Sequence, residues 1–134
     1  CLNAIEGTLE AAQGVDACEP MAAALRDAFG HLKRTTEILL GGMLEQDIDL
    51  VLANSAKYLA FFGHVVVGWM WLRQGLIAAD ALTHAAHADD TDFYRGKLQS
   101  MLYFARWELP QTKVWAELLN DLDDTTYAME AAWF

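Results

Sequence analysis

Residues 53–80 read ANSAKYLAFFGHVVVGWMWLRQGLIAAD, and this stretch decides the fold. Only Lys57, Arg73 and Asp80 are charged in it. At about 100° per residue its bulky apolar side chains cover the whole circumference of a helix: Tyr58, Phe61, Phe62, Val65, Val66, Trp69, Met70, Trp71 and Leu72. Trp69 and Trp71 point about 200° apart and cannot share one narrow seam. Because a helix that is apolar all round must be covered on more than one side, we expect it to lie at the centre of a bundle.

This central helix is predicted to begin after Asp47 or Asp49, either of which can act as N-cap, and to end near His87. It would be a rod of about 40 residues, or about 60 Å. Small residues that predict close helix approach alternate with the bulky ones: Ala56, Ala60, Gly63, Gly68 and Gly75. The uncharged run between Lys57 and Arg73 is shorter than the roughly 20 apolar residues that span a bilayer. We therefore interpret it as a buried helix and expect no transmembrane segment.

Two helices are predicted before this one. The first covers Leu2 to Gln13 and ends at Gly14, and the second opens between Ala17 and Pro20 and weakens at Gly41-Gly42. Apolar residues recur at spacings of three and four along the second: Met21, Leu25, Ala28, Leu32, Thr36, Leu39 and Met43. Its charged residues lie largely on the opposite side: Arg26, Lys33, Arg34 and Glu37. The second helix is therefore predicted to be amphipathic and to lie on the core.

The last helix is predicted to start at Asp90, Thr91 or Asp92 as N-cap. Its inward positions are Tyr94, Leu98, Met101, Ala105 and Leu109, followed after Pro110 by Val114, Leu118 and Leu119. Proline predicts a kink between Arg106 and Pro110, because it removes one backbone hydrogen bond.

Residues 121–134 are predicted as a tail with a break at Asp123-Asp124 and apolar anchors at Tyr127, Met129, Trp133 and Phe134. No strand-like alternation persists anywhere. The fold class is thus predicted to be all-α, as an up-and-down four-helix bundle with one long central helix, a Pro-kinked last helix and a short C-terminal tail.

Composition narrows the function classes. The chain has 134 residues, 54% of them hydrophobic and 21% charged, which predicts a single helical domain over residues 1–134. Its formal charge of −10 disfavours nucleic acid as a partner. Two cysteines, Cys1 and Cys18, provide no disulfide framework and indicate reduced thiols in a cytoplasmic compartment. A sequence that opens at Cys1 is interpreted as a segment of something longer.

Motifs for catalysis are absent from the sequence. No glutamate is followed three residues later by histidine, as di-iron bundles require, and no P-loop, dinucleotide fingerprint or nucleophile elbow is present. Asp80, His84 and His87 share one helix face and could offer a metal a carboxylate and two imidazoles. With Asp89, Asp90 and Asp92 nearby, the plainer interpretation is a solvated helix end followed by an N-cap.

Three further features have both a functional and a plain interpretation. His64 could be a ligand or a base, but we expect a core histidine bonded to a backbone carbonyl or a hydroxyl. A carboxylate base could be hidden at Glu37, Glu45 or Glu108, although Glu37 is predicted to pair with Lys33 or Arg34 on the surface. The five tryptophans could line an acyl or aromatic pocket, and packing is their default role. The residues alone therefore predict no catalytic, cofactor-binding or metal-binding residues.

The stretch 53–80 resembles the long helix in the extra C-terminal domain of the larger acyl-CoA dehydrogenases. The resemblance continues through DFYRGK at residues 92–97, through Leu109-Pro110-Gln111, and to the end, Met129 to Phe134. It spans roughly Leu32 to Phe134 and rests on packing residues.

The resemblance implies a helical domain appended to the core of an FAD-dependent enzyme of fatty acid metabolism, which introduces an α,β double bond into an acyl-CoA. The flavin site and the catalytic glutamate would lie in preceding domains, so the resemblance assigns no site residue to this chain. It implies that the catalytic core of the same enzyme is the partner, that the domain supports assembly or acyl-pocket shape, and that the parent protein forms a homo-oligomer. A free-standing binding module that uses the tryptophan-rich helix, and a small metalloprotein at Asp80, His84 and His87, remain open as alternatives.

Overall fold

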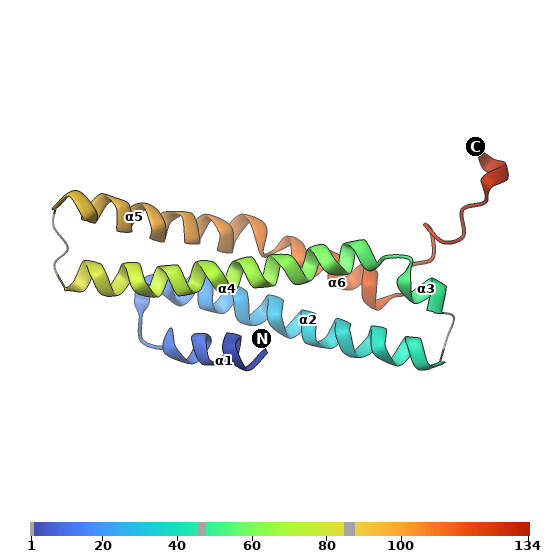
Figure 1. Cartoon of the computed structure of the whole chain (residues 1–134), viewed down its shortest axis with the longest axis horizontal. Coiled ribbons are helices and arrows are strands. Elements are labelled where there is room, and N and C mark those ends of the chain that lie inside the picture. The colour runs from blue at the N-terminus through green and yellow to red at the C-terminus, as the bar shows by residue number, and fades with distance from the viewer. Residues whose placement is uncertain (1, 46–47, 85–87) are drawn as a thin grey trace.

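The computed structural model describes residues 2–45, 48–84 and 88–134, and the regular secondary structure in these ranges is helical. Four rods run up and down side by side (Figure 1). They are α1 (Leu2–Ala11), α2 (Glu19–Glu45), α4 (Ser55–Thr83) and a last rod composed of α5 (Ala88–Tyr103), η2 (Phe104–Glu108) and α6 (Gln111–Asn120). The predicted all-α four-helix bundle is confirmed.

Helix α4 is the central element, as predicted. It contacts α1, α2, α5, η2 and α6. Its two tryptophans are covered from different sides: the Trp69 Nε1 donates to Thr8 Oγ1 of α1 at 2.8 Å, whereas the Lys97 ammonium of α5 lies 5.5 Å from the Trp71 ring. Helix α4 is long and apolar enough to cross a membrane by length and composition. Its contacts on several sides are those of a bundle helix.

Two of the small residues on α4 permit close packing, and a third does not. A Cβ atom at Gly68 would lie 3.1 Å from Leu109 Cδ2, and one at Gly75 would collide with Met101 Sδ. Both glycines therefore allow side chains of neighbouring helices to pack closely against α4. A Cβ atom at Gly63 would meet nothing within 4 Å. The prediction that Gly63 allows close approach is wrong within this chain.

Helix α2 buries the predicted stripe. Its inner side chains are buried at Met21, Leu25, Ala28, Leu32 and Leu39, although Met43 at its end is exposed. The helix does not weaken at Gly41-Gly42 but continues to Glu45. A Cβ atom at Gly42 would lie 3.1 Å from Val51 Cγ2, so this glycine allows α3 to pack closely against α2.

The predicted single rod from Asp47 to His87 is wrong. A short helix α3 (Ile48–Leu52) precedes α4, and the chain turns between them at Ala53 and Asn54. Asn54 occupies the N-cap position of α4, while Asp49 lies inside α3. Helix α4 ends at Thr83 with His84 as C-cap. Asp47 and His87 lie outside the described residues.

The last rod bends where Pro110 predicts. Residues Phe104–Glu108 form a π-helical turn, in which the Leu109 N–H donates to the Phe104 carbonyl at 3.0 Å. Pro110 then occupies the N-cap position of α6. Helix α5 starts at Ala88, so the predicted caps Asp90, Thr91 and Asp92 lie inside it.

The α6 end of this rod departs from the predicted pattern in part. Val114 and Leu118 are exposed rather than inward, while Leu119 is buried. The extra residue of the π-helical turn rotates α6 relative to α5 and so changes which side chains point inward.

The tail leaves the bundle instead of folding onto it (Figure 1). Its root is held by Asn54, whose Nδ2 donates to the Asp123 carbonyl at 2.7 Å and whose Oδ1 accepts from Thr126 Oγ1 at 3.3 Å. Beyond the root, the expected anchors are exposed: Tyr127, Met129, Trp133 and Phe134. The prediction that they attach the tail to this bundle is wrong.

Candidate functional site

His64 and Glu108 form the one ionisable pair that joins α4 to η2 within the described ranges. The His64 Nε2 lies 3.6 Å from Glu108 Oε2, and both side chains are about 30% exposed. The rings of Trp115 and Phe104 flank the imidazole, with centroids 4.7 and 6.1 Å away. The sequence could not place Glu108 here, because the π-helical turn decides which way that side chain faces.

Both nitrogens of His64 are engaged. The Nδ1 lies 3.1 Å from the Ala60 carbonyl oxygen, which can only accept, so Nδ1 carries the proton. The Nε2 faces the carboxylate, whose Oε2 also accepts from Gln111 Nε2 at 3.2 Å. The expected bond of His64 to a backbone carbonyl is present, although the side chain is half-buried rather than in the core. The arrangement connects α4 to η2.

The Asp80 and His84 side chains meet at the end of α4, at 3.2 Å between Oδ1 and Nδ1. Both are about 75% exposed, and Nδ1 also lies 3.0 Å from the Asp80 carbonyl oxygen. His87 and the Asp89 side chain fall outside what the structure describes. Among the described residues, no three His, Cys, Asp or Glu side chains are grouped so that they could hold a metal ion.

The other single candidates are separated from one another. Glu37 is exposed on α2, and Lys33 pairs with Glu6 of α1 at 3.3 Å, so the predicted surface pair between Glu37 and Lys33 is wrong. The Glu45 side chain lies outside the described part. Cys18 is fully buried, and burial raises the pKa of its thiol.

Two hollows in the described residues differ in size and charge. An apolar cavity of about 110 Å³ lies between α2, α3 and α4, lined by Leu39, Val51 and Tyr58 among others, whereas pockets for drug-sized ligands measure about 300–1,000 Å³. A larger hollow beside the α1–α2 turn carries Asp16 and Asp80, which would repel a pyrophosphate. The tryptophans line neither space.

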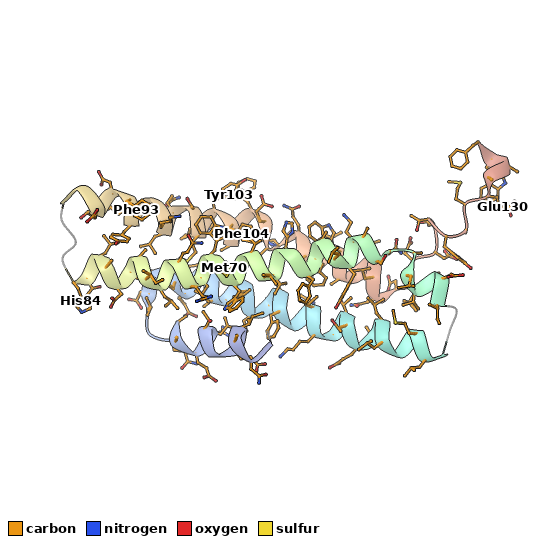
Figure 2. The ribbon with its side chains drawn as sticks, viewed as in Figure 1. Met70, His84, Phe93, Tyr103, Phe104 and Glu130 are labelled. Atoms are coloured by element: carbon orange, nitrogen blue, oxygen red, sulfur yellow. The ribbon has the colours of Figure 1, made fainter. Side chains whose placement is uncertain are left out.

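Pattern reading indicated that α4 needs cover on more than one side, but it did not identify which of its residues stay exposed. We define this face by Leu59, Gly63, Val67, Met70 and Ile77, which recur at helical spacing. Leu59 and Ile77 are 69% and 66% exposed, and Val67 and Met70 are also exposed. Figure 2 shows Met70 midway along α4. The signal was in the sequence, because α4 is apolar all round and the bundle leaves one side of it open.

The comparisons with known proteins identify the class. The family described as "acetyl-CoA dehydrogenase C-terminal like" matches residues 1–130, so the chain belongs to this family. It is a C-terminal accessory domain of the acyl-CoA dehydrogenase type.

A curated relative is the broad-specificity linear acyl-CoA dehydrogenase FadE5 of Mycobacterium tuberculosis, which is 29% identical over 117 residues. The aligned region covers 85% of this chain and 19% of FadE5, so the chain spans about a fifth of that relative's length. No solved structure shows a significant similarity to the chain.

Proposed function

We propose that this chain is the accessory domain of a longer FAD-dependent acyl-CoA dehydrogenase, forming a single helical unit over residues 1–134. The observation that carries the proposal is the family match over nearly the whole chain. The relative FadE5, named for its action on linear acyl-CoA, extends well beyond the matched region. We place the parent enzyme in the cytoplasm and expect it to form a homo-oligomer.

In this proposal the chain supplies support and no catalytic residue. Two of its candidate side chains are engaged or inaccessible: His64 is held by Ala60 and Glu108, and Cys18 is buried. The parent's FAD would accept the hydride when the α,β double bond forms, in a part of the protein outside this chain. The contribution of these helices is a stiff body that packs on the catalytic core and stabilises assembly or the shape of the acyl pocket.

The test compares the longer polypeptide with the isolated chain. We expect the longer polypeptide to be yellow and to reduce a dye in the presence of a linear acyl-CoA, and the isolated chain to do neither. As a control, the longer polypeptide with His64→Phe and Glu108→Gln should keep more than half of its activity. Flavin absorbance in the isolated chain, or loss of activity in a folded control variant, would contradict the proposal.

A further inference from the structure

The outward face of α4 is long, apolar and almost free of charge. It runs from Leu59 to Ile77, and residues 55–79 contain no aspartate or glutamate although the whole chain has 19. Arg73 is the charge beside this face, with its guanidinium 5.3 Å from the Trp69 ring. Among the described residues, no carboxylate lies within ion-pair distance of Arg73. The acidic surface of the molecule is therefore interrupted along α4.

The described part of this chain does not cover the face. Gly63 lies in its middle, and a Cβ atom there would meet nothing within 4 Å. The tail, which could have covered an apolar surface, leaves from the α3–α6 end and its apolar side chains are themselves exposed (Figure 1). The exposed apolar side chains along α4 are therefore open to a partner outside the described part of this chain.

The size of the face discriminates between a free partner and a tethered one. Eighteen residues at 1.5 Å span about 27 Å, and one helix is about 10 Å wide, so the footprint is about 270 Å². A stable complex of free proteins uses about 800 Å² on each partner. A segment of the same polypeptide needs far less buried area to stay bound, because the covalent connection raises its effective concentration to the millimolar range.

The net charge of the chain argues against two other partners for this face, namely a second copy of the chain and an anionic membrane surface. A second copy would bring another net formal charge of −10 into the complex, and the net negative charge of the chain would also oppose its approach to an anionic lipid surface. The remainder of one polypeptide is bound by its connection and needs only to match a narrow apolar strip.

We propose that the outward face of α4 seats this domain on the catalytic part of its own polypeptide, against an apolar helical surface that carries a carboxylate opposite Arg73. The inference rests on the proposed function for the identity of that part. The face itself is assigned from exposure, charge and size.

Site-specific cysteine labelling tests the assignment. Leu59→Cys and Ile77→Cys lie on the face, and Val114→Cys and Leu118→Cys on α6 are matched controls, since these side chains are also at least half exposed. Each variant is labelled with a maleimide, alone and within the longer polypeptide, and the rate at each site is read by peptide mass spectrometry. We expect similar rates in the isolated chain. In the longer polypeptide, labelling should slow at least tenfold at positions 59 and 77 and not at 114 and 118, and Arg73→Glu should restore labelling at 77.

Other outcomes overturn the inference. Unchanged rates at 59 and 77, or equal slowing at all four sites, would remove the assignment to α4. Slow labelling in the isolated chain that recovers on dilution would show that a second copy covers the face. Protection of 59 and 77 by vesicles of phosphatidylcholine with phosphatidylserine would show a membrane surface. Flavin content and dye reduction, measured on the same preparations, test the proposed function separately.

Discussion

At the scale of single residues, glycines on one helix have different roles because of what lies opposite them. Gly68 faces Leu109 and Met21 at 3.1 to 3.3 Å from a Cβ position, whereas Gly63 faces open space. We predict that Gly68→Leu destabilises the chain by about 1–3 kcal/mol through overpacking. Gly63→Ala should instead stabilise it by up to about 1 kcal/mol, because alanine favours helix. Urea unfolding of both variants checks this, and a Gly68→Leu variant as stable as the parent would contradict it.

Cys18 makes stability depend on pH. Burial raises the pKa of its thiol above the ordinary value of 9.0, so the folded state holds the proton more tightly than the unfolded chain does. This contribution is complete below the unfolded pKa and is lost as pH rises through the folded pKa. We predict that the free energy of unfolding falls more between pH 8.5 and about 10.5 in the parent than in Cys18→Ala. Parallel slopes for the two proteins in denaturant titrations would refute this.

Three other residues show which contacts can be predicted from the sequence and which cannot. The 200° separation of Trp69 and Trp71 required two different covers, and α1 and α5 supply them. Glu108 could not be placed beside His64 in advance, because that depends on a backbone bond between Leu109 and Phe104. Helical periodicity predicts the direction of a side chain around its own helix. Its contacts with other helices depend on residues far away in the sequence, which periodicity does not describe.

At the scale of elements, the π-helical turn changes the expected role of Pro110. In a regular helix interior, proline costs about 3 kcal/mol, so its removal would stabilise the chain. Here Pro110 is the N-cap residue of α6 with φ of −61°, which proline adopts without strain. We therefore predict that Pro110→Ala destabilises by about 0.4–1 kcal/mol, through greater freedom of the unfolded chain. A thermal melt that rises by several degrees would show that proline strains the rod.

The break between α3 and α4 shows why the predicted 40-residue rod failed. A pattern search that starts the helix at Asp47 or Asp49 passes over Asn54, whose side chain bonds to the tail root at Asp123 and Thr126. A contact over about 70 positions in sequence thus accompanies a helix start. We predict that Asn54→Ala lowers stability by about 1–2 kcal/mol, because it removes these two bonds to the tail root. The matched control is Asn3→Ala, because Asn3 is an exposed residue of α1. This control substitution should change the unfolding midpoint little.

At the scale of the whole molecule, the bundle and the tail contribute separately. The apolar side chains after Thr126 are exposed, so they add little to the stability of this chain. A chain that ends at Ala128 keeps the root bonds from Asn54 and the bond from the Ala128 N–H to the Asp124 carbonyl. We predict that its melting temperature equals that of the full chain within about 2 °C. Because Trp133 and Phe134 are among the most exposed large side chains, the shortened chain should also bind less hydrophobic dye. Shortening that lowers the melting temperature by 5 °C or more, with dye binding unchanged, would show that the tail is folded against the bundle in solution.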